Sequence, residues 1–538
     1  MIDRRLLLKA GALGLGALAF PGVAQLLAAR GFTHNVASGE PRQRSVMLWT
    51  RYLPEAGESG RLSWQVSPDA EFGRIVADGM VTASEAHDFC VKPMVTGLQP
   101  GRWYHYRFRD ARGRLSPVGR TRTLPEGPVP SFRLGLFSCS NLGFGWFNAY
   151  GHAAARRDID LMVHVGDYYY EYPRGRYPTA AQAVAGRIVE PETEAVRLAD
   201  YRLRLAAYRA DPDLQRLHQY FPVIAMWDDH ETCNDSWMNG GQNHQPATEG
   251  DWAERKAAAV RAYREWMPVA DDSWESYEIG DLATLFRPET RLTARSRSFY
   301  LREVLNNQPD HAAALAAFRD GPWQDPARTL MGPEQEAWLA DGLRRSVGRR
   351  AKWQVLAQQV LVGTLAMPAE ANGWLGPAAT DGFRAFVANM VEAGQAGLPS
   401  GLDSWDGYPA ARRRLLRSAL DADANLVVLS GDSHNAWAFD LDLDGHKAGI
   451  EIGGTSVTSP GNEDDFPGVA PDVAVRATLA RNPQLKWTNL HQRGYATLHL
   501  TPQRATAEWL FMRTIRERNP ALAGRHVMTS VRGANRYG

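Results

Sequence analysis

The pattern of apolar and polar positions divides the chain, after its first 30 residues, into two unlike parts. Residues 31 to about 125 contain short strand-like runs at Ser45–Thr50, Leu62–Val66 and Trp103–Phe108, separated by turn-forming residues such as Pro54. Short strands with regular turn signals are typical of a small β-sandwich. This pattern predicts an N-terminal β-sandwich domain over residues 31–125.

From residue 131 onward, apolar strand-like runs alternate with helical stretches, which predicts an α/β layered core over residues 126–538. The Pro- and Gly-rich stretch 123–130 is the best linker candidate. We expect inserted loops at 170–200, 236–250 and 366–400, where they would shape a substrate cleft. The predicted strands are Phe132–Ser138, Leu161–Val165, Val223–Trp227, Trp353–Leu356 and Leu426–Ser430, and the predicted helices are Asn148–Arg157, Asp200–Ala210 and Ala253–Trp266.

The first 30 residues have the layout of an export signal, with a basic start followed by the uncharged stretch Ala10–Phe20. That stretch is shorter than the roughly 20 residues needed to cross a membrane, so we expect no stable membrane span. Arg4 and Arg5 resemble the bacterial twin-arginine signal, although Asp3 stands where Ser or Thr is usual. We therefore predict a twin-arginine export signal at 1–30, the twin-arginine machinery as a partner, and a periplasmic or secreted location; the alternatives are a membrane anchor or a loose apolar tail.

Composition and charge narrow the classes of protein that remain. The 538 residues are 44% hydrophobic and 22% charged, which excludes a disordered, collagen-like or disulfide-scaffold protein. The net charge of +1 gives no basic excess, so we expect no specific nucleic-acid binding. Cys90, Cys139 and Cys233 are the three cysteines, an odd number that leaves at least one thiol unpaired.

The candidate chemistry lies directly after four of the predicted strands. The motifs are Ser138–Asn141, Gly166–Glu171, Trp227–Glu231 and Gly431–His434. Ligands gather outside the carboxyl ends of the strands in an open α/β sheet, so folding is expected to bring the four motifs together. Carboxylates suit calcium or magnesium, whereas imidazole, thiolate and phenolate suit iron or zinc.

Each motif taken alone also has an ordinary structural interpretation. Gly166–Asp167 would then be a turn, Asp432 a helix cap, and Cys139 a small buried apolar residue. The acidic run at 228–231 would be a charged helix start. Their joint occurrence at four strand ends favours a dinuclear metal site, which can bind phosphate and generate hydroxide at neutral pH.

These motifs, in this order, resemble those of the PhoD-type alkaline phosphatases, a branch of the metallophosphatase superfamily similar to purple acid phosphatases in its core. The resemblance implies a layered α/β/β/α metallophosphatase core preceded by a small fibronectin-like β-sandwich. The matching segments cover nearly all of the chain after the signal: 32–41, 46–51, 137–141, 164–172, 200–204, 227–231, 353–360, 403–409, 431–434 and 454–460.

The resemblance also implies ferric iron and calcium as cofactors. Carried over residue by residue, the iron ligands are Cys139, Asp167, Tyr170 and His434. The resemblance further implies that Asp167 bridges to calcium and that Asp229, Asp432 and Gln359 complete the calcium shell.

The resemblance also suggests roles for two further residues. The resemblance implies that His230 faces the phosphate and assists the leaving group or holds an oxygen, and Arg202 is a candidate for a phosphate contact or for structural pairing near the site. The chain departs from the family at Glu289–Arg291, where Asp-Thr-Arg is frequent, and at Thr232–Asp235 after the acidic motif. These changes put substrate preference in doubt more than metal binding.

The predicted reaction is hydrolysis of a phosphate ester by a metal-bound hydroxide. No Gly-x-Ser-x-Gly elbow supports a serine nucleophile, and Gly453–Ser456 is interpreted as a strand-end turn. The alternative is a phosphodiesterase or phospholipase-like hydrolase with the same metal site. A rival from another class is an exported ligand-binding or structural calcium protein without activity.

Overall fold

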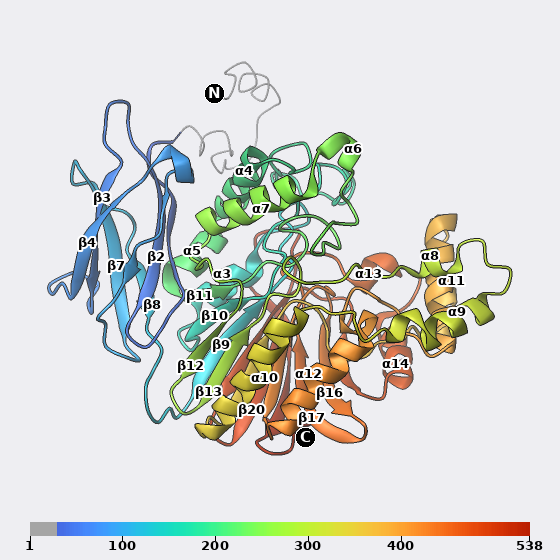
Figure 1. Ribbon diagram of the computed structural model, residues 1–538. Coiled ribbons are helices and arrows are strands. Elements are labelled where there is room, and N and C mark those ends of the chain that lie inside the picture. Colours follow the sequence, from blue (N-terminus) through green and yellow to red (C-terminus); the bar gives the residue numbers. More distant parts are fainter. Residues whose placement is uncertain (1–28) are drawn as a thin grey trace.

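The structure is a computed structural model that describes residues 29–538, so the predicted signal, apart from its last two residues, lies outside the described part. Figure 1 shows two large sheets packed face to face, with helices on both outer sides. One buried cluster contains apolar side chains from the inner faces of both sheets, among them Leu134, Val163, Val355 and Val427. The predicted α/β/β/α layering is confirmed.

The first large sheet has ten strands and contains the parallel run of β9, β10, β11 and β1 at its centre. Strands β9, β10 and β11 are short and almost wholly buried, as expected for strands covered on both faces. In order across the sheet, the strands are β21 (Leu522–Val531), β20 (Arg504–Met512), β19 (Gly494–Leu500), β9 (Phe132–Phe137), β10 (Leu161–His164), β11 (Pro222–Ala225), β1 (Gly31–Gly39), β2 (Val46–Leu53) and β5 (Cys90–Val91), with β6 (Met94–Val95) also paired to β2.

The second large sheet has seven strands, of which β13, β14, β15 and β17 run parallel. Parallel strands end at one edge, so the loop after β15 lies beside the loops that follow its neighbours. In order the strands are β12 (Glu275–Ile279), β13 (Ala283–Arg287), β14 (Trp353–Ala357), β15 (Leu426–Ser430), β17 (His446–Gly453), β16 (Ala436–Leu443) and β18 (Leu485–Asn489).

Helices bury the outer face of each large sheet. The outer side of the ten-stranded sheet packs against α3 (Asn148–Ala155), α4 (Leu198–Arg209), α5 (Pro212–Tyr220) and α7 (Trp252–Trp266). The outer side of the seven-stranded sheet packs against residues of α10 (Gly332–Gly348) and α12 (Pro409–Asp421), among others. Shorter or peripheral helices are η1 (Glu85–His87), α6 (Pro246–Glu249), α8 (Leu301–Leu305), α9 (His311–Asp320), η2 (Pro322–Gln324), η3 (Ala369–Gly373), α11 (Asp381–Gln395), η4 (Trp405–Gly407), α13 (Asn462–Asp465) and α14 (Pro471–Arg481).

The expectation of a loop over 366–400 is wrong for its second half, which forms helix α11. Thr380 caps the helix by accepting a hydrogen bond from the Phe383 amide at 3.2 Å. Val387, Met390 and Val391 are buried one turn apart, which is the spacing of an amphipathic helix. The sequence therefore contains the apolar period of this helix.

The N-terminal part forms a β-sandwich that shares a sheet with the core. Its four-stranded sheet, in the order β4 (Ala77–Thr82), β3 (Arg61–Ser67), β7 (Trp103–Asp110) and β8 (Gly119–Arg122), packs on β1 and β2. Strand β1 in turn pairs in parallel with β11, where Ser38 lies opposite Pro222. The two parts are thus joined by main-chain hydrogen bonds, and the predicted boundary near residue 125 stays a prediction. Across residues 29–538, none of the helices has the length and apolar character to cross a membrane.

Candidate metal centre

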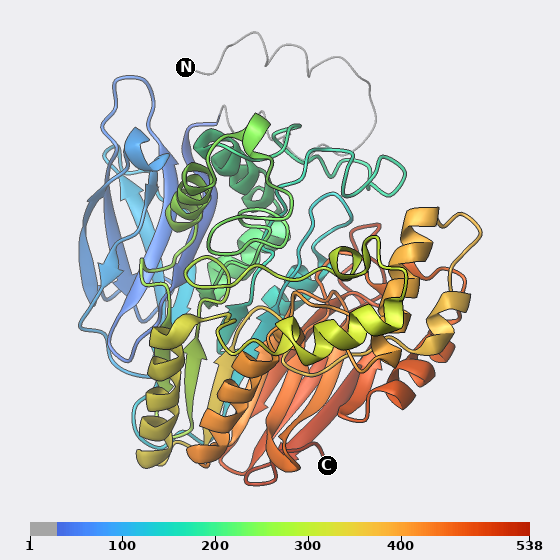
Figure 2. The ribbon, with the colours of Figure 1, turned by 45° about the vertical axis from the view of Figure 1, so that its right-hand side comes forward.

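The four strand-end motifs meet at one edge of the paired sheets, as the sequence predicted. Cys139 follows β9, Asp167 follows β10, and Asp432 and His434 follow β15 of the facing sheet (Figure 2 shows the two sheets from a second direction). All four residues have positive φ, at 57°, 52°, 62° and 61°. Left-handed backbone at non-glycine residues is strained and is concentrated at functional sites, so these loops are shaped for the positions of their side chains.

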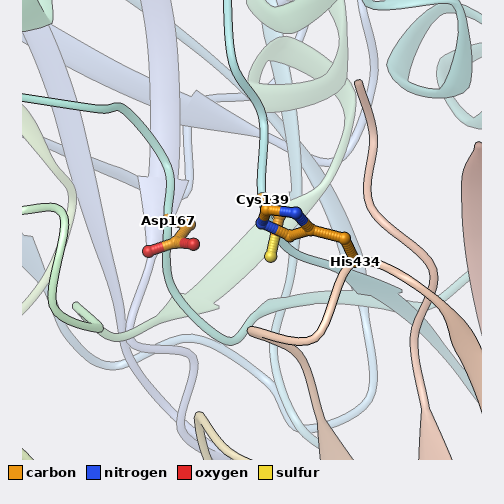
Figure 3. A group of neighbouring side chains, drawn as sticks. All are labelled: Cys139, Asp167 and His434. Atoms are coloured by element: carbon orange, nitrogen blue, oxygen red, sulfur yellow. The ribbon is translucent and has the colours of Figure 1, made fainter. Parts of the chain in front are cut away.

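The first group of side chains, here called the cysteine half, consists of Cys139, Asp167, Tyr170 and His434. Potential ligand atoms of Cys139, Asp167 and His434 all lie within 4.8 Å of one another (Figure 3). The Tyr170 hydroxyl donates to Asp167 Oδ2 at 3.0 Å and lies 3.1 Å from His434 Nε2. The other ring nitrogen, His434 Nδ1, is 2.7 Å from the Pro460 carbonyl. Because a carbonyl only accepts, Nδ1 carries the hydrogen and Nε2 is left with a lone pair for a cation.

The second group, here called the acidic half, consists of Asp228, Asp229 and Asp432, whose carboxylate oxygens also lie within 4.8 Å of one another. Asp167 and Asp229, together with His230, form a third such group. Asp167 therefore belongs to the cysteine half and also lies against the acidic half. The bridging role that the family resemblance implies for Asp167 stays a prediction.

A buried arginine, Arg291, supplies positive charge to the acidic half. Its guanidinium forms an ion pair with Asp228 and lies 3.4 Å from Asp432 and 3.7 Å from Asp229. It also pairs with Asp403 at 2.5 Å. Sequence reasoning noted the segment around Arg291 only as a departure from the family pattern, and gave neither Arg291 nor Asp228 or Asp403 a role.

His230 lies between the two halves with its ring held by a second carboxylate. Glu171 Oε2 is 2.7 Å from His230 Nδ1, and the ring centroid of Tyr170 is 4.2 Å away. Although burial lowers the pKa of His230, the carboxylates of Asp229, Glu171 and Asp167 outweigh it and raise this pKa well above its ordinary value. The carboxylates around His230 thus favour its protonated form, and Nε2 is the ring nitrogen that is not paired with Glu171. Glu171 is another residue that the sequence analysis did not single out.

Gln359 lies beside the acidic half, but both ends of its side-chain amide already have protein partners. Its Oε1 accepts from Thr290 Oγ1 at 2.7 Å, and its Nε2 donates to the Trp227 carbonyl at 2.8 Å. Its own carbonyl accepts from the Gly431 amide at 2.7 Å, immediately before Asp432. These contacts fix the Asp432 loop, and they leave one lone pair of Oε1 for a cation.

Arg202 is not brought into this group. Its guanidinium forms two hydrogen bonds of 2.7 Å with Glu265 of α7, and a third to the Ala86 carbonyl. The contacts correspond to the structural pairing that was one of its two predicted roles, and they use the guanidinium that a phosphate contact would need. The arginine that lies among the predicted ligands is Arg291.

The residues fit cations on two observations. Asp167 Oδ1, Asp228 Oδ2 and Asp229 Oδ1 are buried and accept no hydrogen bond, which is costly for a carboxylate oxygen unless a positive group is near it. Burial, followed by the nearby Asp167 charge, raises the pKa of Cys139 and of Tyr170 well above the ordinary range. The thiolate and phenolate forms therefore need a cation beside them, and the mixed donor set suits one hard and one softer ion.

Comparison with known proteins agrees with this geometry. The profile of the PhoD-like phosphatases matches residues 134–509, and that of their N-terminal domain matches residues 19–125. The chain belongs to the PhoD-like phosphatase family. It is 32% identical over 518 residues to alkaline phosphatase D of Bacillus subtilis (strain 168), covering 92% of this chain and 80% of that protein.

Solved structures show the same relationship. A structure of PhoD superposes with a TM-score of 0.77 at 30% identity, covering 95% of this chain and 92% of the other. A purple acid phosphatase from yellow lupin (Lupinus luteus) seeds has a TM-score of 0.52 at 12% identity, covering 93% and 74%, so it shares the fold. Membership of the PhoD-like family makes the chain a phosphoric ester hydrolase of the alkaline phosphatase type.

Proposed function

We propose that this chain is an exported alkaline phosphatase that hydrolyses phosphate esters at a paired site for ferric iron and calcium. The observation that carries the proposal is the position of Asp167, which lies within ligand distance of both the cysteine half and the acidic half. A carboxylate in that position can be shared by two adjacent cations. The residues that would hold iron are Cys139, Asp167, Tyr170 and His434, and those that would hold calcium are Asp167, Asp229, Asp432 and Gln359.

Two bound cations would supply positive charge for the phosphate oxygens and would activate water for attack on phosphorus. The protein supplies the remaining parts. Arg291 offsets the charge of the acidic half, so that the carboxylates can lie close together. Buried strands at fixed register hold the ligands in place, which keeps the cost of reorganisation small.

His230 is the proposed proton donor for the leaving alcohol. Its Nδ1 is occupied by Glu171, so Nε2 is the nitrogen that can face a substrate. The Glu171 carboxylate at Nδ1 favours the protonated ring, and a protonated imidazole beside the leaving oxygen can transfer its proton as the ester bond breaks. Glu171 then acts by orienting His230.

The test is hydrolysis by protein purified from an exporting host and loaded with iron and calcium. We expect turnover of p-nitrophenyl phosphate that is lost in a chelator and restored by the two metals. Bis-p-nitrophenyl phosphate, the corresponding diester, measures the phosphodiesterase alternative in the same assay. A loaded protein that hydrolyses neither ester would contradict the proposal and favour a binding role.

Export by the twin-arginine route is proposed on Arg4 and Arg5 and the uncharged stretch after them. Replacing both arginines by lysine keeps the charge and removes the paired guanidinium groups. We expect the precursor to accumulate inside the cell and the periplasmic or secreted activity to fall. Unchanged export of the double variant would contradict this route.

A further inference from the structure

A pocket with a volume of about 340 Å³ opens beside the acidic half of the metal centre. We call it the side pocket. Figure 1 shows its helices α8 and α11 next to each other at one end of the molecule. Phe386 of α11 is 54% exposed, so it lies at the pocket's solvent side. The residues used below are Asp235, Phe299, Leu301, Phe386, Leu402 and Asp403.

Three contacts join the side pocket to the metal centre. The Asp235 amide donates to Asp229 Oδ2 at 2.7 Å, and Asp403 pairs with Arg291 at 2.5 Å. Asn234, also in the pocket wall, accepts from the Tyr172 hydroxyl at 2.7 Å. The Tyr172 ring lies 5.2 Å from that of His230, measured between centroids. The pocket wall thus contacts Asp229 of the acidic half directly, and it is connected through Tyr172 to His230, the proposed proton donor.

The charge of Asp403, at the inner end of the side pocket, is offset by the protein itself. Asp403 pairs with Arg291 at 2.5 Å and with Arg295 at 2.7 Å, and it accepts a hydrogen bond from Ser298. These two arginines hold the pKa of Asp403 at the low end of its range despite burial. The group therefore stays an ion pair rather than a free charge that would select a charged ligand.

Most of the exposed surface of the side pocket is apolar, although Gln242, Arg302 and Asn389 also line it. Leu301 and Leu402 are buried, and Phe299 is half-buried against Phe318, with ring centroids 5.0 Å apart. Phe386 packs at 6.0 Å on Phe383 and extends this wall to the surface. A large aromatic side chain that is half exposed at the mouth of a pocket is available to cover a ligand.

We propose that the side pocket binds the organic group of the phosphate ester. It favours a long, uncharged apolar chain over a short one. This inference rests on the proposed phosphatase function, because the ester's phosphate must occupy the adjacent metal centre. Each methylene that is fully buried improves binding by roughly fourfold. An alkyl chain longer by four methylenes, even if only half buried, is therefore expected to gain about tenfold or more.

The test compares hexyl phosphate with ethyl phosphate in the metal-loaded protein. The two leaving alcohols are almost equally basic, so the ratio of their kcat/KM values reports contact with the chain. We expect a ratio of about ten or more for the wild type. Phe386→Ala removes part of the wall and is expected to lower the ratio several-fold. Asn389, also on α11, lines the same pocket. Asn389→Trp fills the pocket and is expected to bring the ratio near one.

Val527→Ala is the matched control, because it removes an exposed apolar side chain from β21, outside the pocket. It should leave the ratio unchanged, and thermal melting checks that each variant is folded. Calorimetric binding of hexylphosphonate and ethylphosphonate, which have no ester bond to hydrolyse, gives a ratio without turnover, and so separates the two proposals. If the protein does not hydrolyse the esters but retains the binding ratio, only the proposed phosphatase function is contradicted. If the wild-type ratio is near one in both measurements, the proposed role of the side pocket is overturned.

Discussion

Buried negative charge is stabilised differently in the two halves of the metal centre. In the acidic half, Arg291 brings a permanent cation into the group and lies within ion-pair distance of Asp228, Asp229 and Asp432. In the cysteine half, the Tyr170 hydroxyl donates to Asp167, accepts from Ser459 and lies 3.1 Å from His434 Nε2. Burial there disfavours the thiolate and the phenolate, as the raised pKa values of Cys139 and Tyr170 indicate.

This difference indicates how each half depends on its ion. The acidic half has part of its charge compensated within the chain, so its geometry can form before a divalent cation binds. The cysteine half is expected to reach its charged form only when an ion of high charge displaces the thiol and phenol protons. Four predictions test this contrast, from the largest expected effect to the smallest.

Asp167→Asn removes the carboxylate that touches both halves. We expect kcat/KM for p-nitrophenyl phosphate to fall by about a thousandfold or more, because neither cation keeps its shared ligand. The variant should still fold, since asparagine is nearly the same size as aspartate. Asp444→Asn, at an exposed position that pairs with Arg413, is the control and should retain activity. Activity within tenfold of the wild type would place the shared ligand elsewhere.

Arg291→Met removes the internal cation of the acidic half. In a chelator, we expect the free energy of unfolding to fall by about 3–5 kcal/mol, the usual cost of leaving buried carboxylates without their partner. Excess calcium should recover more stability in this variant than in the wild type. Urea unfolding with and without calcium measures both effects.

The control for this variant is Arg202→Met. Arg202 pairs with Glu265, which keeps a second partner in Arg261 at 2.9 Å, so we expect a loss of only about 1 kcal/mol. If Arg291→Met and the wild type are equally stable in the chelator, Arg291 does not compensate the charge of the acidic half, and the two halves do not differ in this respect.

Cys139→Ser changes the cysteine half alone. We expect iron content and the visible absorption of a ferric tyrosinate to fall, and turnover to fall by at least about 10–100-fold, as even the loss of an outer partner of a metal ligand has that effect. Calcium binding should remain. Cys90→Ser is the control, since Cys90 is also a buried free thiol but lies in β5, outside the centre. Simultaneous loss of both ions in Cys139→Ser would show that the halves are not separate.

The smallest effect concerns Glu451, which supports the strand leading to Asp432 by accepting from Ser430 Oγ at 2.8 Å. Burial raises the pKa of Glu451 to about 7. A carboxyl that binds its proton more tightly when folded stabilises the protein most below its unfolded pKa near 4.5, and loses that contribution as the pH rises through 7.

Relative to Glu451→Gln, wild-type stability should therefore fall by on the order of 2 kcal/mol between pH 5 and pH 8. Urea unfolding of both proteins at the two pH values gives this difference. A difference that is independent of pH would mean that Glu451 is ionised in the folded protein across this range.

Much of the layering and of the predicted ligand cluster follows from the sequence, because buried parallel strands have apolar runs and end in the residues that matter. Cys139, Asp167 and His434 come together for this reason. Arg291 was not predicted to be central, because its role depends on three carboxylates from distant strand ends. For Arg202 the sequence left a phosphate contact and structural pairing both open, because it does not show which acid lies opposite a helix; the structure pairs Arg202 with Glu265.

Anomalous diffraction from crystals of the protein purified with its own metals tests the central claim most directly. Data collected on both sides of the iron edge locate iron, and longer wavelengths locate calcium. The account predicts iron bonded to Cys139 Sγ and His434 Nε2, and calcium beside Asp229 and Asp432. Iron bound to the acidic half, or the same ion in both positions, would contradict it.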